Sequence, residues 1–406
     1  MSKRVPKLRF KEFESDGEWE EKRLGEIVKI NGRIGYRGYT VDDIVPKGQG
    51  AITLSPSDFI NNIIDISKST YISWFKYNES PEIQIENGDI LFVKTGSTYG
   101  KIAYVSGLNE KATINPQIVV FKDITVNNYF LYNYFLHNFI RNQIEEIVGG
   151  GTIPTISQKQ LAKIKFFIPK PKEQQKIANT LSSLDNLIMS EDKKLQALQT
   201  YKKGLMQQLF PKEGERVPKL RFKEFESDGE WEEKKIGDIF KVTRGEVLSM
   251  NMVEKNSSKI TPYPVYSSQT KNNGLAGYYS DYLFENAITW TTDGANAGDV
   301  NFRKGKFYCT NVCGVLINTN GYANQFIAEL LNTVTKKHVS YVGNPKLMNG
   351  VMASIIIPIP SLQEQQKIAN TLSSLDNLIE NQSKKIEALK EHKKGLMQQM
   401  FVSEDS

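Results

Sequence analysis

The stretch EQQKIANTLSSLDNLI at residues 173–188 occurs a second time, unchanged, at residues 364–379. A second passage, RVPKLRFKEFESDGEWEEK, is found at residues 4–22 and again at residues 216–234. An internal repeat of this length predicts two copies of one architecture within a single chain.

The segments between the repeated passages differ from each other. Residues 24–170 and 236–360 have little sequence in common, although the motif KKGLMQQ follows both helical repeats, at residues 202–208 and 393–399. The sequence therefore indicates one frame that is used twice, around two different inserts.

The helical repeats carry a heptad pattern of apolar residues. Residues 173–210 contain no proline, and a helix of that length would span about 57 Å. Polar residues interrupt the pattern at Glu191 and Lys202, and at Gln382 and Lys393 in the second copy. Because a polar residue on such a seam can fix register, we expect the two helices to pair with each other. The predicted seam consists of Ile177, Leu181, Leu184, Ile188, Leu195, Leu198, Leu205, Ile368, Leu372, Leu375, Ile379, Ile386, Leu389 and Leu396.

Two ordinary amphipathic helices, each packed on its own domain, are the alternative. The inserts read as mixed structure, with strands near residues 89–93 and 287–291 and helices near residues 127–147 and 322–333. The expected fold class is α+β, with two mixed α/β domains joined by two long antiparallel coiled-coil helices in a pseudo-twofold repeat.

Composition favours a folded protein of the cytosol. The chain has 406 residues, of which 39% are hydrophobic and 24% charged, and no apolar run is long enough to span a bilayer. A net charge of +6 favours an anionic partner but does not identify one. Two cysteines, Cys309 and Cys313, and three scattered histidines supply neither a disulfide framework nor a metal site.

Polar turns in both inserts are the candidate contact sites for nucleic acid. Glycine permits close approach of a backbone, hydroxyl and amide groups bond to bases and phosphates, and basic residues neutralise phosphates. Any solvated turn has a similar composition, so a single segment is weak evidence. The candidate DNA-binding residues are Arg33, Tyr36, Arg37, Lys94, Thr95, Ser97, Thr98, Tyr99, Lys101, Arg244, Ser267, Ser268, Gln269, Lys271, Thr291, Thr292, Asn296 and Arg303.

Catalytic motifs are missing from the sequence. KTGSTYGK at residues 94–101 has three residues between its glycines and Ile102 after its lysine, unlike a phosphate-binding loop. Residues 115–117 and 344–346 begin with Asn-Pro but lack the second proline and the aromatic residue of an amine-methylating motif. We expect a chain without catalytic residues or a cofactor of its own.

The whole pattern resembles the DNA-specificity subunit of type I restriction–modification systems. The resemblance rests on the two repeated passages, on DILFVKTGSTYGKIAYV at residues 89–105, on GGGTIPTISQKQLAKIKFFIPKPKEQQKIA at residues 149–178, and on AITWTTDGANAGDV at residues 287–300. It implies two target recognition domains, each reading one half of an interrupted double-stranded DNA sequence.

The resemblance also implies a division of the chain and a set of partners. It places the recognition domains at residues 1–172 and 211–363, the central helices at 173–210 and 364–401, and a tail at 402–406. It implies two methylation subunits that bind S-adenosylmethionine and, in the full complex, two restriction subunits that use ATP and Mg²⁺.

Two questions stay open at this point. The link from the paired prolines to EQQ reads PKEQQ in the first copy and PSLQEQQ in the second, two residues longer, so the seating of the helix starts is undecided. A protein-interaction scaffold, with two binding modules on a helical spacer and no DNA, is the alternative function.

Overall fold

The computed structural model describes residues 4–60, 63–148, 154–268 and 272–403, apart from the side chain of Tyr36. The chain forms two compact units. The first unit contains residues 1–192 and 384–406, and the second unit contains residues 193–383. Each unit therefore holds one insert with part of both long helices, whereas the sequence predicted the helices as segments separate from the domains.

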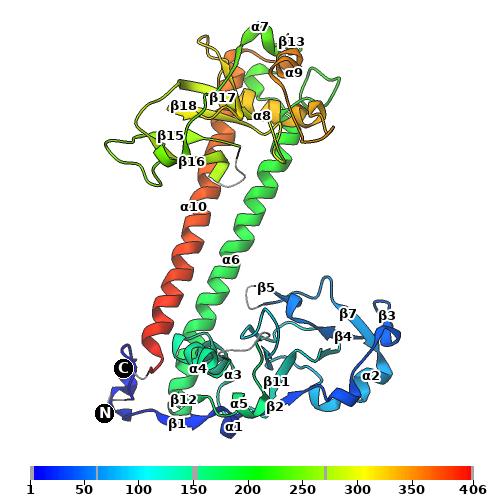
Figure 1. Ribbon diagram of the computed structural model, residues 1–406, viewed down its shortest axis with the longest axis vertical. Helices are drawn as coiled ribbons and strands as arrows, with labels where there is room; N and C mark the ends of the chain where they lie inside the picture. The colour runs from blue at the N-terminus through cyan, green and yellow to red at the C-terminus, as the bar shows by residue number, and fades with distance from the viewer. Residues whose placement is uncertain (1–3, 61–62, 149–153, 269–271, 404–406) are drawn as a thin grey trace. The chain divides into compact units, whose positions relative to one another are not determined.

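The two long helices are α6 (Pro171–Leu209) and α10 (Leu362–Met400), each of 39 residues. Both begin two residues before the predicted start, and proline fits the first turn of α6 because no intrahelical N–H is needed there. Figure 1 shows both helices as long, continuous ribbons.

The starts of α6 and α10 are seated in the same way, which answers the question that the longer second link left open. Gln174 Nε2 donates to the carbonyl of Pro169 at 2.8 Å, and Gln365 Nε2 donates to that of Pro360 at 3.0 Å. Pro360 is thus the counterpart of Pro169. Pro358 lies inside the preceding strand, and that displaced proline produced the apparent insertion.

The repeated passage near each insert is held to the start of a long helix by a buried ion pair. Arg9 contacts both carboxylate oxygens of Glu173 at 2.8 Å, and Arg221 contacts those of Glu364 at 2.8 and 2.7 Å. In each pair the guanidinium also donates to a turn carbonyl, that of Gly17 in the first unit. These contacts fix the turn, the guanidinium and the helix start together.

A short antiparallel ladder accompanies each ion pair. Strand β1 (Glu20–Arg23) pairs with β12 (Lys165–Ile168) in the first unit. Strand β13 (Glu232–Lys235) pairs with β20 (Ile356–Ile359) in the second. The ladders join the two ends of each insert.

The first unit has two four-stranded sheets, in the orders β10-β4-β7-β3 and β2-β11-β8-β9. The predicted strand near residues 89–93 is β8. The predicted helix near residues 127–147 is two helices, α3 and α4, and at the break between them the Phe139 amide donates to His137 Nδ1 at 3.2 Å. The elements are α1 (Leu24–Ile27), β2 (Lys29–Gly32), β3 (Ile44–Val45), β4 (Gly50–Leu54), β5 (Phe59–Ile60), β6 (Ile63–Ile64), β7 (Thr70–Ser73), α2 (Trp74–Asn78), β8 (Ile90–Val93), β9 (Ile102–Tyr104), β10 (Ala112–Ile114), β11 (Ile118–Lys122), α3 (Asn128–Phe135), α4 (Asn138–Val148) and α5 (Gln158–Leu161).

The second unit has one six-stranded sheet, in the order β14-β19-β17-β18-β15-β16. The predicted strand near residues 287–291 belongs to β17, and the predicted helix near residues 322–333 is α8. The elements are α7 (Ile236–Ile239), β14 (Lys241–Arg244), β15 (Tyr263–Tyr266), β16 (Leu275–Tyr279), β17 (Phe284–Thr291), β18 (Val300–Cys309), β19 (Cys313–Ile317), α8 (Gln325–Val334) and α9 (Asn349–Ser354).

The C-terminal end of one long helix closes the core of each unit. In the first unit Phe401 packs on Tyr134, with ring centroids 4.6 Å apart, and the Tyr134 hydroxyl donates to the Val402 carbonyl at 2.7 Å. In the second unit Phe210 packs on Phe326 at 5.4 Å. Both phenylalanines are buried, as expected for aromatic anchors.

Three of the four polar interruptions of the seam make ion pairs between α6 and α10. In the first unit Lys393 contacts Asp185 at 2.7 Å and Lys385 contacts Glu191 at 2.6 Å, so the helices are antiparallel. In the second unit Lys202 contacts Asp376 at 2.7 Å. None of the fourteen predicted seam residues is exposed. Paired charges at these positions favour one register.

No helix in the described part of the chain has the length and apolar character needed to cross a membrane.

We expect Glu173→Gln to destabilise the first unit by about 3 kcal/mol, because Arg9 would stay buried without its counter-charge. The Arg9 and Glu173 side chains are only 6% and 1% exposed. The midpoint and slope of urea unfolding measure the loss. Glu12→Gln is the control: it removes a contact with Lys176 in which both side chains are 49% exposed, and we expect no measurable change. Equal effects of the two variants would contradict the structural role of the buried pair.

Candidate nucleic-acid interface

Strand register brings the predicted turns of the first insert to one edge of a sheet. Gly32 at the end of β2 pairs with Val119, and Val93 at the end of β8 pairs with Ile118. The ends of β2 and β8 therefore flank the start of β11. We call the turns that meet there, at residues 33–40, 94–101 and 115–117, the first rim.

The contacts of the 94–101 turn hold it at this edge. The Lys94 amide donates to the Gln117 carbonyl at 2.8 Å, and the Gly96 amide donates to the Pro154 carbonyl at 3.1 Å. Ser97 and Lys101 are exposed, whereas Tyr99 packs partly against the core. Lys94, Thr95 and Thr98 are half-buried.

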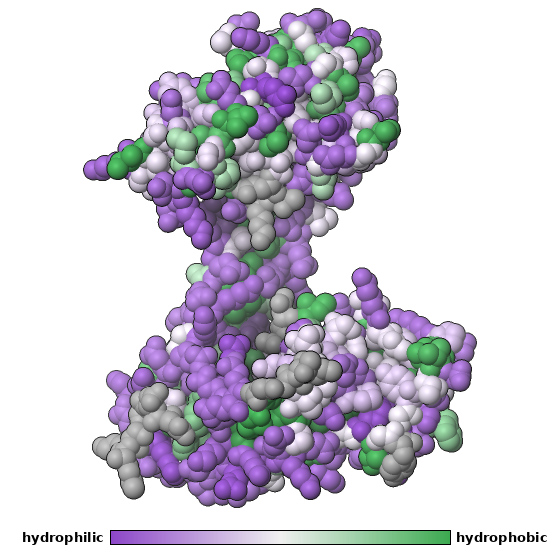
Figure 2. Space-filling view, in the orientation of Figure 1, coloured by the Kyte–Doolittle hydropathy of each residue, from purple (hydrophilic) through white to green (hydrophobic). Residues whose placement is uncertain are grey.

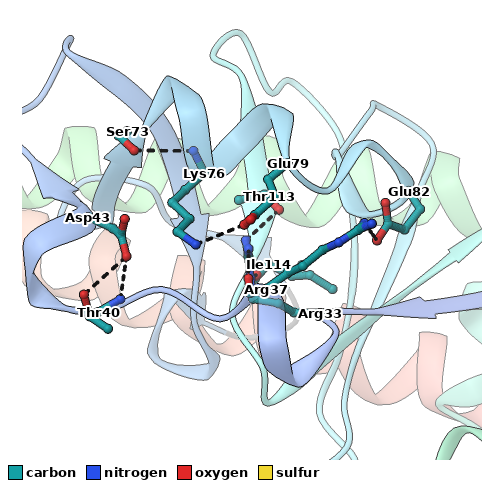
Figure 3. Close-up of polar contacts among 10 residues, drawn as sticks. All are labelled: Arg33, Arg37, Thr40, Asp43, Ser73, Lys76, Glu79, Glu82, Thr113 and Ile114. Carbon is teal, nitrogen blue, oxygen red and sulfur yellow. Dashed lines mark hydrogen bonds and ion pairs between the residues drawn. The ribbon is translucent and has the colours of Figure 1, made fainter.

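Arg33 lies inside the first unit and organises the neighbouring turn (Figure 3). It is 6% exposed. Its guanidinium donates to the Ile114 carbonyl at 3.0 Å, to Thr113 Oγ1 at 3.2 Å and to the Arg37 carbonyl at 3.3 Å. It also lies 5.3 Å from the centre of the Tyr39 ring. A side chain bound in this way supports the rim.

Acidic residues surround this arginine network. Glu82 contacts Arg37 at 3.4 Å, and Glu79 contacts Lys76 at 3.0 Å. Burial lowers the pKa of the Arg33 guanidinium, and the charges of the nearby glutamates oppose that shift. Arg37 is half-buried in the 3₁₀ turn Gly35–Arg37, whose middle residue Tyr36 has its side chain outside the described part of the chain.

The second unit repeats the strand arrangement of the first rim. Arg244 at the end of β14 pairs with Gly314, and Thr291 at the end of β17 pairs with Cys313. The ends of β14 and β17 therefore flank the start of β19. We call the turns that meet there, at residues 243–245, 267–268, 291–299 and 310–313, the second rim.

A polar pocket of about 190 Å³ lies in the second rim. Four candidates from the sequence line it, namely Ser267, Thr291, Asn296 and Arg303. The structure thus brings together three segments that are separated along the chain. Hydroxyl, amide and guanidinium groups give the pocket both donors and acceptors.

Arg303 is buried like Arg33. It is 8% exposed and donates to Thr289 Oγ1 at 3.0 Å and to the Asn273 carbonyl at 2.7 Å. Its guanidinium lies 3.7 Å from the centre of the Tyr266 ring, a cation–π contact. Burial lowers the pKa of this guanidinium, and the Tyr266 ring opposes that shift.

The remaining candidates of the second insert differ in accessibility. Arg244 is exposed and donates to the Asn311 carbonyl at 2.7 Å, and Ser268 is half-buried. Thr292 is buried, and its hydroxyl bonds to Asp293 and to the Val312 carbonyl. It therefore supports the turn. Gln269 and Lys271 lie outside the described residues.

The rims also contain residues that the sequence did not indicate. In the first rim Asn115 and Gln117 bond to each other at 3.3 Å beside the 94–101 turn. Beside the second rim, Asn301 and Asn332 also line the pocket. Only the Asn-Pro dipeptide at residue 115 gave a signal, and we considered it as a methylation motif rather than as part of a rim.

The structure holds no metal-ligand cluster of three or more His, Cys, Asp or Glu side chains within the residues it describes. Cys309 and Cys313 are buried and unbridged. Burial raises the pKa of the Cys313 thiol to about 11, so this thiol is protonated at neutral pH.

Comparisons with known proteins agree on one family. Residues 16–200 and 228–391 match the family model of the type I restriction modification DNA specificity domain. A protein of Methanocaldococcus jannaschii, named as a type I restriction enzyme specificity subunit, is 26% identical over 94% of this chain and 92% of its own. A protein of Mycoplasma pneumoniae, named as the N-terminus of a type I specificity subunit, is 42% identical over 34% of this chain and 75% of its own.

Solved structures share the fold. The S subunit of a type I restriction-modification system from M. genitalium has a TM-score of 0.63 at 16% identity, with 98% of this chain and 99% of that chain covered. A second chain, from a study of complex assembly in a type I system, has a TM-score of 0.55 at 16% identity, with 96% and 98% covered.

We expect Arg33→Met to loosen the turn that follows β2, because the three oxygen atoms bound by the guanidinium would lose their donor. Hydrogen exchange of the Arg37 and Gly38 amides, which donate within this turn, should become about 10-fold faster. Lys101→Gln is the control, since the side chain of this exposed residue makes a single long contact among the described residues that the substitution would remove, to the Phe59 carbonyl at 3.5 Å. Unchanged exchange in Arg33→Met would show that the turn is held by other contacts.

Proposed function

Because this chain belongs to the family of type I restriction–modification DNA specificity subunits, we propose that it reads a bipartite, interrupted DNA target. One unit reads each half-site, through the first rim and the second rim respectively. The observation that carries the proposal is the similarity of the two rims. In each rim the ends of two strands flank the start of the strand that lies between them, yet the side chains at the two rims differ.

The chemistry of the rims suits a duplex. Exposed Ser97 and Lys101 in the first rim, and exposed Arg244 in the second, combine a hydroxyl donor and acceptor with cations for phosphates. The pocket of the second rim adds the amide of Asn296, a group that can pair with adenine in the major groove. Because the two rims have equivalent strand arrangements but different side chains, the two units would prefer different bases.

The chemical steps belong to other subunits in this proposal. Two methylation subunits would bind S-adenosylmethionine and methylate adenine, and two restriction subunits using ATP and Mg²⁺ would join in a full complex in the cytoplasm. The repeated helices favour two identical methylation subunits as partners. The leucine at the same position of the repeat is exposed in both copies: Leu187 is 42% exposed and Leu378 is 53% exposed. The paired helices would also set the spacing of the half-sites.

The first test is a genome-wide map of adenine methylation after expression of this chain with its methylation subunit. We expect a new interrupted motif, methylated on both strands, only when both proteins are present. Each protein expressed alone is the control. If the two proteins do not co-purify, the protein-interaction scaffold is the better explanation. If they co-purify and no motif appears, the result points to a defective recognition domain or a mismatched methylation subunit.

Substitutions in the two rims should separate the half-sites. We expect Ser97→Ala with Lys101→Gln to weaken binding to duplexes that carry the first half-site, and Arg244→Gln with Asn296→Ala to affect only the second. Each pair should cost roughly 10-fold or more in affinity, measured at fixed salt because phosphate contacts are salt-dependent.

Half-site duplexes with the other half scrambled provide the comparison. Equal losses on both duplexes from substitutions in a single rim would contradict the assignment of one half-site to each unit.

A further inference from the structure

A short turn beside the second rim presents two consecutive apolar side chains to solvent. Val342 is 92% exposed and Tyr341 is 67% exposed. The Ser340 and Lys346 backbones exchange two hydrogen bonds, at 2.8 and 2.9 Å, and these close the turn over residues 340–346. Gly343 has a φ of +75°, a left-handed conformation that glycine adopts without strain.

The 340–346 turn is fixed to the second rim by backbone hydrogen bonds. The Gly294 amide donates to the Pro345 carbonyl at 2.9 Å, and the Leu347 amide donates to the Thr292 carbonyl at 2.9 Å. Asn349, at the start of α9, donates to the Thr243 carbonyl at 3.3 Å. The turn is therefore tied to two of the segments that form the second rim.

Tyr341 and Val342 form the tip of this turn, and the packing of the second unit does not explain why they are exposed. The visible face of the protein is mostly hydrophilic, with hydrophobic residues scattered across it (Figure 2). Single exposed apolar residues of that kind are ordinary. Here, however, two lie side by side at the end of a closed turn, and the flanking Val339 and Leu347 are buried and anchor it. Turns that only face water usually carry polar residues at such positions.

The charge of the same segment favours a polyanionic partner. Residues 335–346 contain Lys336, Lys337 and Lys346 and no acidic residue. In the structure Lys336 pairs with Asp299 and Lys337 with Glu213, both in exposed ion pairs of the weak kind that a phosphate can replace. Lys346 is half-exposed and lies 3.7 Å from Asp293, a loose contact, so its ammonium group can turn to a phosphate. An apolar tip between cations matches the groove of a DNA duplex, with bases at its centre and phosphates along its sides.

We propose that Tyr341 and Val342 form a wedge that contacts the bases of the second half-site in duplex DNA. This inference rests on the function proposed above. The Tyr341 ring stacks on a base at the edge of a base-pair step, Val342 fills the adjoining space, and Lys346 contacts a flanking phosphate. Aromatic and aliphatic wedges of this type unstack base steps in known DNA complexes.

The test uses the full chain with its methylation subunit and a duplex that carries the mapped target. We expect Y341A/V342A to bind this duplex roughly 10-fold more weakly, the loss typical of removing one stacked base contact. 2-Aminopurine placed in the second half-site should brighten on binding of the wild-type complex, because the base loses its stacking neighbour. It should stay dim with the variant.

Ile260→Ala is the matched control, because it removes an apolar side chain that is 81% exposed in the same unit. We expect it to bind like the wild type. On a duplex whose second half-site is scrambled, the wild type and Y341A/V342A should bind equally. Thermal unfolding should be unchanged in both variants, since the substituted side chains are exposed.

Other outcomes separate the two proposals. If the wild type binds the target and Y341A/V342A matches it in affinity and fluorescence, the wedge is wrong and the proposed function stands. If the variant loses the methylation subunit while the isolated chain keeps its DNA affinity, the tip binds protein and the wedge is again wrong. If the wild-type complex binds the target duplex no more tightly than a scrambled duplex, the proposed function is wrong.

Discussion

The architecture of both units depends on one buried interaction, the pairing of an arginine from the repeated passage with a glutamate at the start of a long helix. Arg9 with Glu173 and Arg221 with Glu364 each join a turn near the start of an insert to the helix that follows its end. Both partners are almost fully buried, so each charge depends on the other for the solvation that it has lost. The pair thereby fixes both ends of an insert against one helix and leaves the insert itself free to vary.

The two inserts differ mainly in their side chains and much less in their backbones. Their sequences have little in common, yet in both units the first and third strand ends flank the start of a central strand. A glycine amide in each rim also donates to the carbonyl of a proline, Gly96 to Pro154 and Gly294 to Pro345. Backbone hydrogen bonds do not depend on side-chain identity, so this frame can persist while the side chains on it change.

The sequence predicted the long helices well because their pattern is local and repeated. The heptad spacing identified the seam, and the polar interruptions at Glu191, Lys202 and Lys393 are ion-paired positions. The prolines before the helices were misleading, because a proline inside β20 resembled the one that precedes α6. Sequence comparison alone does not distinguish a proline that follows a strand from one within it. The hydrogen bond from Gln365 to the Pro360 carbonyl identifies Pro360 as the proline that precedes α10.

The candidate site was harder to predict, because its residues meet through strand pairing between distant segments. Glycine-rich turns pointed to Ser97, Lys101 and Asn296, which lie at the rims. The same composition also pointed to Thr292, which the structure buries as a support. Exposure is a tertiary property, and a turn's composition does not reveal which of its polar groups are already bonded. For the same reason the apolar tip at Tyr341 gave no signal in a search for polar contacts.

The two buried arginines show how different sequences meet one physical requirement at the rims. Arg33 follows β2 and Arg303 lies within β18, so they do not occupy equivalent positions. Each nevertheless donates to a threonine hydroxyl and lies over a tyrosine ring, in one unit Tyr39 and in the other Tyr266. A guanidinium stays charged even when burial lowers its pKa, because its unperturbed value is so high. Each therefore places a fixed positive charge beneath a rim, where the low dielectric of the protein screens it less than water would. In the proposed interface this charge would favour binding of a phosphate backbone, whereas the exposed side chains of the rims would differ with the target.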